Sequence, residues 1–146
     1  MVVNQIDGPC ALIAQSMGGV VAIRAALARP EHVTHLVLAA TSGGLDIAGL
    51  GAQDWRELVR KDFPTLPDWF LNYHEDLSGQ LSDLRMPMLL LWGDADPISP
   101  VNVGERLLRL LPCADLHIIK GADHDLAYTH AAAVAGLIDQ HLAHVR

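Results

Sequence analysis

Short, continuous apolar runs alternate along this chain with stretches in which apolar residues recur at helical spacing. The first pattern is typical of strands buried on both faces, and the second is typical of amphipathic helices. Their alternation predicts an α/β fold, in which βα units form a parallel sheet flanked by helices. Four strands are predicted, at Ala11–Gln15, His35–Ala40, Met88–Trp92 and Asp115–Ile119. Three helices are predicted, at Gly18–Ala28, Pro100–Leu111 and Leu126–Val145.

The stretch from residue 42 to residue 84 breaks this alternation with glycines and prolines. Periodicity and capping signals predict short helices there, at Asp54–Lys61 and from Asp68, as N-cap, through Tyr73. The stretch also holds five of the chain's seven aromatic residues. It is either a reduced helical lid over an apolar pocket or a small satellite core, and we expect the lid. The residues expected to bind substrate from it are Trp55, Trp69, Phe70 and Tyr73.

Composition narrows the class of protein. The 146 residues predict one domain over residues 1–146, and a 51% hydrophobic, 18% charged composition excludes a disordered chain. A formal net charge of −7 with scattered Lys and Arg argues against a nucleic-acid partner. Without a basic leader or an apolar run long enough to span a bilayer, the chain is expected to be cytoplasmic and to have no membrane partner.

The first candidate for chemistry is the serine in Ala14-Gln15-Ser16-Met17-Gly18-Gly19. This segment lies where the first predicted strand passes into the first predicted helix. Small residues two positions before and after Ser16 let the backbone bend sharply, which presents the hydroxyl above the sheet. A serine hydroxyl is a weak nucleophile until a neighbouring base takes its proton. The turn therefore requires a base, and an acid to orient that base.

Both groups follow later strands. The third strand ends in an acidic turn that contains Asp94 and Asp96, and the fourth ends shortly before His124. The carboxyl ends of parallel strands lie at one edge of the sheet, where open α/β sheets place their sites. The residues alone leave the choice between the two carboxylates open. A zinc site at Asp123, His124 and Asp125 is a weak alternative, because no second His or Cys cluster stands at ligand spacing.

These motifs resemble the α/β-hydrolase fold family, specifically its small lidded serine esterases, thioesterases and carbon–carbon bond hydrolases. The resemblance rests on the serine turn, on Leu91-Trp92-Gly93-Asp94-Ala95-Asp96-Pro97 and on Gly121-Ala122-Asp123-His124, in the order that the family's Ser-Asp-His triad requires. It implies that Ser16 is the nucleophile, His124 the general base and Asp96 the group that orients it. The backbone N–H of Met17 is implied as an oxyanion donor. The resemblance implies hydrolysis of a small ester-like substrate through an acyl-enzyme, with no metal or organic cofactor.

The chain resembles only the carboxyl-terminal portion of that family. Members usually carry several further strands before the serine strand, and a loop that supplies the second oxyanion N–H. The strand near Leu12 is therefore expected to form an edge, which a symmetric copy or a separate partner chain covers. A truncated, catalytically impaired interaction module that works through this edge is the alternative to an active hydrolase.

Overall fold

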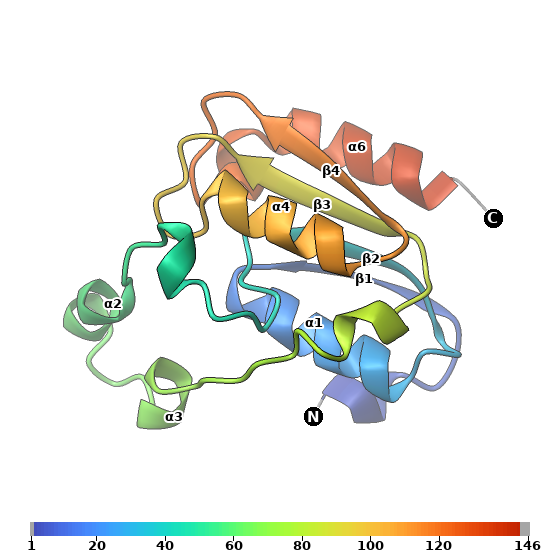
Figure 1. Cartoon of the computed structure of the whole chain (residues 1–146), viewed down its shortest axis with the longest axis horizontal. Coiled ribbons are helices and arrows are strands. Elements are labelled where there is room, and N and C mark those ends of the chain that lie inside the picture. Colours follow the sequence, from blue (N-terminus) through green and yellow to red (C-terminus); the bar gives the residue numbers. More distant parts are fainter. Residues whose placement is uncertain (1, 144–146) are drawn as a thin grey trace.

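A parallel four-stranded sheet forms the centre of the computed structural model, which describes residues 2–143, the side chain of Leu58 excepted. The strands are β1 (Cys10–Gln15), β2 (Val33–Ala39), β3 (Met88–Gly93) and β4 (Ala114–Ile119), paired in the order β1-β2-β3-β4 (Figure 1). The register places Leu36 opposite both Leu12 and Met88. The predicted parallel α/β sheet is confirmed, with each strand within two residues of its expected bounds.

Helices cover both faces of the sheet (Figure 1). The helices α1 (Met17–Ala28) and α4 (Val101–Leu110) pack on one face, and α6 (Ala131–Ala143) packs on the other. Side chains alternate across β2, so that Leu36 and Leu38 join the larger core under α1 and α4 while Val37 joins the smaller core under α6. Within residues 2–143, every helix is too short or too polar to cross a membrane.

The last helix differs from the prediction. One helix was expected over Leu126–Val145, but the chain forms α5 (Leu126–Thr129) and then α6, with a break at His130, where φ is −122°. The Thr129 hydroxyl donates to the Asp125 carbonyl, and such side-chain bonds to the preceding turn bend or end helices. The apolar spacing continues across the break, so periodicity did not reveal it. The predicted end at Val145 lies outside the described residues.

The insertion between β2 and β3 projects beyond the carboxyl end of the sheet (Figure 1). It contains α2 (Arg56–Asp62) and α3 (Asp68–Leu71), together with the short 3-10 helices η2 (Ala48–Leu50) and η3 (Leu81–Asp83); a further one, η1 (Val2–Gln5), precedes β1. Both α-helices are shorter at one end than predicted, and Pro67 rather than Asp68 is the N-cap of α3. The segment that leads from the insertion back to β3 packs on the larger core through three buried leucines: Leu77, Leu81 and Leu84.

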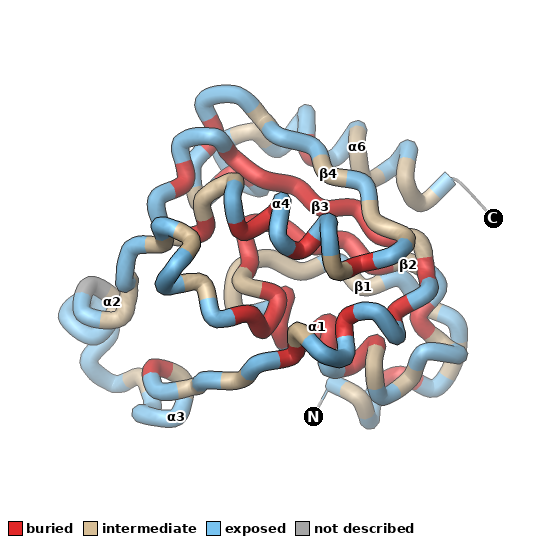
Figure 2. Tube along the Cα trace, viewed as in Figure 1, coloured by how far each residue is buried: buried red, intermediate tan, exposed pale blue. Residues whose placement is uncertain are grey.

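Strand β1 lies at one edge of the described sheet, as expected. Figure 2 shows the contrast with β3, which is buried along its whole length. In β1 the side chain of Leu12 packs on the larger core, whereas Ile13 points to the other face and is 57% exposed. One side of this strand and part of one face are therefore open.

The ends of β3 and β4 approach so closely that only glycine fits at Gly93. A Cβ there would lie 2.1 Å from the Ala122 carbonyl oxygen and 2.5 Å from its carbon. The same carbonyl accepts a 2.9 Å hydrogen bond from Ala95 N–H. The loops after β3 and β4 are thus held in direct backbone contact.

We predict that Gly93→Ala lowers the free energy of unfolding by about 1–3 kcal/mol, because two backbone segments must separate. Gly136→Ala is the matched control, since Gly136 lies exposed in α6 with open space around its Cα. That change should instead stabilise the protein, by about 0.5–1 kcal/mol. Urea unfolding followed by circular dichroism measures both. Equal effects of the two substitutions would contradict the close-contact interpretation.

Candidate active site

Ser16 lies on a strained turn between β1 and α1. Its φ is +54°, a left-handed conformation that non-glycine residues rarely adopt. The turn is held because Ser16 N–H donates to the Ala39 carbonyl at 3.0 Å and Gly19 N–H donates to the Ser16 carbonyl at 3.0 Å. A Cβ at Gly19 would lie 2.5 Å from Thr41 Oγ1, so a larger residue there would push α1 away from the end of β2. Neighbouring backbone therefore fixes where the hydroxyl stands.

The structure brings Ser16, His124 and Asp96 into one hydrogen-bonded chain. His124 Nε2 is 2.9 Å from Ser16 Oγ, and His124 Nδ1 is 2.9 Å from Asp96 Oδ2. The three residues follow β1, β4 and β3 respectively, at the carboxyl edge of the sheet. Asp96 is 4% exposed, and the His124 side chain is 20% exposed. A hydroxyl, an imidazole and a buried carboxylate in this geometry can activate the hydroxyl as a nucleophile.

The two carboxylates of the acidic turn have separate partners. Asp96 Oδ1 accepts hydrogen bonds from Ile98 N–H at 2.8 Å and Ser99 N–H at 3.0 Å, while its Oδ2 faces the imidazole. Asp94 Oδ1 instead accepts from Gly121 N–H at 2.6 Å. Asp94 therefore fastens the start of the loop that carries the histidine, and Asp96 contacts the ring.

Met17 directly follows Ser16 and is the first residue of α1. The amides in the first turn of a helix have no carbonyl one turn earlier, and the helix dipole makes this end favourable for negative charge. An oxygen that becomes negative beside Ser16 Oγ would lie next to these amides. This is the place where the sequence predicted the oxyanion donor.

An apolar cavity of about 380 Å³ opens over the serine. Ser16 and His124 are its polar lining residues, and the others are Met17, Trp55, Val59, Phe63, Leu66, Phe70 and Ile98. Trp55 and Phe70 pack edge to face at 5.9 Å. Of the four residues predicted to bind substrate, these two line this cavity, whereas Trp69 is 69% exposed and lies against Phe70.

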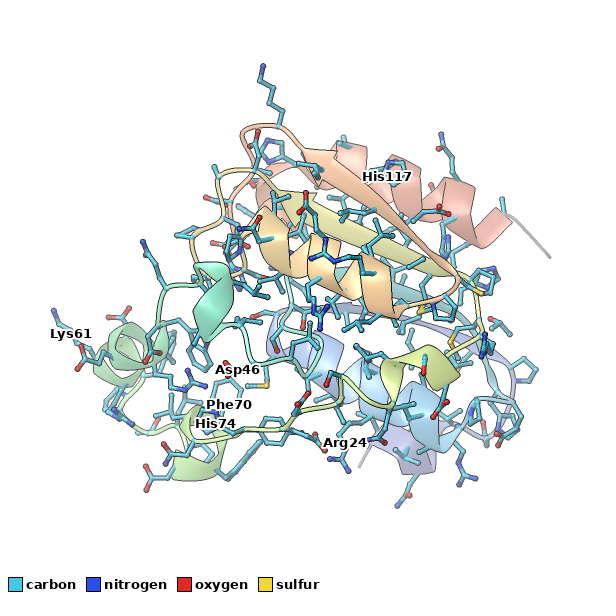
Figure 3. All side chains as sticks on the ribbon, in the orientation of Figure 1. Arg24, Asp46, Lys61, Phe70, His74 and His117 are labelled. Atoms are coloured by element: carbon cyan, nitrogen blue, oxygen red, sulfur yellow. The ribbon has the colours of Figure 1, made fainter. Side chains whose placement is uncertain are left out.

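Tyr73, the fourth of those residues, lines a second cavity of about 500 Å³ that shares Met17 and Trp55 with the first. Its hydroxyl donates to Glu75, which also pairs with Arg24 of α1. The Tyr73 hydrogen bond, followed by Arg24, lowers the pKa of Glu75, and burial raises the pKa of Tyr73. Figure 3 shows Arg24 below this segment, with Phe70 and His74 nearer α3. These contacts tie the return of the insertion to α1.

Sequence reasoning missed two groups of supporting residues. Gln15 Nε2 donates to the His124 carbonyl at 2.8 Å, joining the serine strand to the histidine loop. Trp92 Nε1 donates to Ser99 Oγ at 3.2 Å, and Ser99 Oγ donates to the Thr41 carbonyl at 3.2 Å. Gln15 and Trp92 stand inside motifs that the sequence singled out, but nothing in either motif shows which distant carbonyl or hydroxyl its side chain meets.

The described residues contain no group of three or more His, Cys, Asp and Glu that could hold a metal ion. His124, the centre of the alternative zinc cluster, faces Ser16 and Asp96 with its two ring nitrogens.

Comparisons with known proteins place these features in context. The family described as Serine aminopeptidase, S33 matches residues 1–69. The chain is 34% identical to a 2-hydroxy-6-oxononadienedioate/2-hydroxy-6-oxononatrienedioate hydrolase of Burkholderia vietnamiensis, over 56% of this chain and 27% of the relative. It is 27% identical to a pimeloyl-acyl-carrier-protein methyl ester esterase of Neisseria meningitidis, over 93% of this chain and 70% of that protein. A solved hydrolase of Pseudomonas aeruginosa has a TM-score of 0.75 at 21% identity, over 98% of this chain and 69% of that one.

We predict that Gln15→Met loosens the histidine loop without unfolding the protein, because the substitution keeps the volume and removes the donor to the His124 carbonyl. Amide hydrogen exchange at residues 123–126 should accelerate about fivefold, as expected for loss of a bond worth about 1 kcal/mol. Gln80→Met, at an exposed glutamine before η3, is the control and should leave these amides unchanged. Unaltered exchange in Gln15→Met would show that the loop is held without this bond.

Proposed function

Because the chain belongs to the α/β-hydrolase family, we propose that it hydrolyses a small carboxylic ester, thioester or related acyl bond through an acyl-enzyme on Ser16. The observation that carries the proposal is the continuous contact from Ser16 Oγ through the His124 ring to buried Asp96, at the floor of an apolar cavity. Family membership alone would leave the chemistry open. The geometry supports the proposed roles of nucleophile, base and orienting acid, because a hydroxyl, an imidazole and a carboxylate lie within hydrogen-bond distance of one another.

In the proposed reaction, Ser16 Oγ attacks the substrate carbonyl carbon while His124 Nε2 accepts the hydroxyl proton. The charge that develops on the carbonyl oxygen is stabilised by Met17 N–H at the start of α1. Asp96 holds the imidazole with Nδ1 protonated and stabilises the imidazolium. The tetrahedral intermediate collapses when His124 returns the proton to the leaving alcohol or thiol, and the acyl group stays on Ser16.

Water completes the proposed cycle. His124 takes a proton from a water molecule as that water attacks the acyl-enzyme carbonyl, and the second intermediate releases the carboxylic acid. The proton returns to Ser16 Oγ. The two relatives support hydrolysis in general: one is named as a dienedioate or trienedioate hydrolase and the other as a methyl ester esterase. They differ in substrate, so they do not fix the substrate of this chain.

Strand β1 supports a second candidate function, a binding module that works through its open edge. A strand edge presents unpaired N–H and C=O groups, and this edge carries the exposed Ile13. A second copy of the chain is the simplest occupant, because two such edges are self-complementary about a two-fold axis. Absent ester turnover together with strong association with another protein would favour this function over hydrolysis.

We predict that a phosphonylating serine probe labels Ser16 and that His124→Ala slows labelling about a thousandfold, because the base is lost. His117→Ala is the control, since His117 is an exposed histidine on β4 (Figure 3) and should leave the rate unchanged. Peptide mapping by mass spectrometry locates the label. An unlabelled native protein, or equal labelling of Ser16→Ala, would overturn the assignment.

We predict that the native protein sediments as a dimer at micromolar concentration and that Ile13→Lys shifts it toward monomer, because a charge then replaces an apolar contact at the β1 edge. Ile118→Lys is the matched control, with the same residue type at 49% exposure on β4, the opposite edge of the described sheet. Analytical ultracentrifugation distinguishes them. A stable native monomer, or dissociation by Ile118→Lys alone, would exclude self-association through β1.

A further inference from the structure

The lining of the cavity over Ser16 points to the chemical class of the acyl group. Apart from Ser16 and His124, the lining residues that the structure describes are apolar or aromatic, and none of these carries a positive charge. We propose that the acyl group is uncharged and apolar, and that the site discriminates against acyl groups that end in a second carboxylate. This inference rests on the proposed hydrolase function and adds to it a choice between substrates.

A buried carboxylate without a cation or hydrogen-bond donor costs several kcal/mol. Val59, Leu66 and Ile98 offer neither, and the His124 ring already lies between Ser16 and Asp96. An alkyl chain in the same position loses water and contacts apolar side chains, which is favourable. The cavity therefore separates the two kinds of acyl group by charge rather than by length.

Three nearby cations, Arg56, Arg24 and Lys61, are directed elsewhere. Arg56 Nε donates to the Leu71 carbonyl at 2.7 Å, its Nη1 lies 3.3 Å from Asp54, and its guanidinium stacks 5.3 Å from the Trp55 ring centre. Arg24 pairs with Glu75. Figure 3 shows Lys61 at the outer end of α2, pointing away from the rest of the protein.

The neighbouring cavity adds repulsion. Among the described residues that line it are one arginine, Arg56, and four carboxylates: Asp46, Asp54, Glu75 and Asp76. Hydrogen bonds lower the pKa of three of them, from Arg56 N–H to Asp54, from the Tyr73 hydroxyl to Glu75 and from Ser78 to Asp76. With their pKa lowered, Asp54, Glu75 and Asp76 are ionised at neutral pH, so an anionic acyl group meets negative potential on this side.

The proposed preference for an uncharged acyl group distinguishes this chain from one of its relatives. The Burkholderia vietnamiensis protein is named for a dioate, which carries two carboxylates. A site that takes such a substrate needs a partner for the second carboxylate. Neither Lys nor Arg is among the described residues that line the apolar cavity of this chain, so no fixed cation faces that position.

The test compares two esters that differ in one terminal group. The p-nitrophenyl ester of hexanoic acid ends in a methyl group, and the mono-p-nitrophenyl ester of adipic acid ends in a carboxylate on a chain of the same length. We expect kcat/KM for the hexanoate ester to exceed that for the adipate ester by about tenfold or more. Equal values, or preference for the adipate ester, would overturn the inference while leaving hydrolysis by Ser16 intact.

A substitution that adds a cation at the cavity tests the same preference in the opposite direction. Phe63 lines the cavity and is 60% exposed, so Phe63→Arg places a cation at the cavity with little loss of packing. It should raise the adipate-to-hexanoate ratio of kcat/KM about tenfold. Trp69→Arg adds the same charge at an exposed aromatic residue of the same insertion that does not line this cavity, and should leave the ratio unchanged. Equal shifts from both variants would mean that overall charge, not the cavity, decides.

A binding measurement separates failure of this inference from failure of the proposed function. Ser16→Ala is titrated with hexanamide and with the monoamide of adipic acid, following tryptophan fluorescence, since Trp55 lines the cavity. Tighter binding of hexanamide supports the inference even if the native protein neither turns over esters nor reacts with the phosphonate. Equal or tighter binding of the charged amide overturns it.

Discussion

Backbone contact between Gly93 and Ala122 is the constraint on which the candidate site depends. Asp and His have short side chains, so an imidazole reaches a carboxylate only if the loops that carry them leave the sheet together. The contact of Gly93 with Ala122, the Ala95 hydrogen bond to the same carbonyl and the Asp94 bond to Gly121 N–H hold those loops against each other. Because β3 and β4 are parallel neighbours, both loops emerge at the same edge.

The position of Ser16 depends on a different set of contacts. Ser16 follows β1, which is separated from β3 by β2, so its position depends on the strained turn and on hydrogen bonds that cross the edge of the sheet. Ser16 N–H bonds to the end of β2, and Gln15 bonds to the His124 carbonyl. The carboxylate side of the site is thus fixed by backbone, whereas the serine and histidine are joined partly through one side-chain amide. A change at Gln15 would therefore act on alignment more than on the stability of the sheet.

Much of this could be predicted from the sequence, because strands buried on both faces and helices with one apolar stripe leave clear patterns. The four strands, their parallel arrangement and the edge position of the first were predicted correctly, and the motif order placed Ser16, Asp96 and His124 at one sheet edge. The break at His130 was missed, since a side-chain bond to a carbonyl leaves no trace in periodicity. The sequence also could not predict which aromatic residues line a cavity and which lie at the surface, because this depends on how α2 and α3 pack on each other.

Strand β1 connects the two candidate functions physically. Gln15 is its last residue and Ser16 follows directly, and in the described sheet β1 pairs with β2 on one side only. A strand added along the open side would restrict the motion of the segment that positions the serine, because backbone pairing extends to the end of β1. The free energy of binding at this edge and the free energy of aligning Ser16 with His124 are then coupled, so a change that stabilises one also stabilises the other. The two proposed functions, binding through β1 and chemistry at Ser16, are for this reason not independent of each other, and a measurement of either needs the association state of the chain to be known.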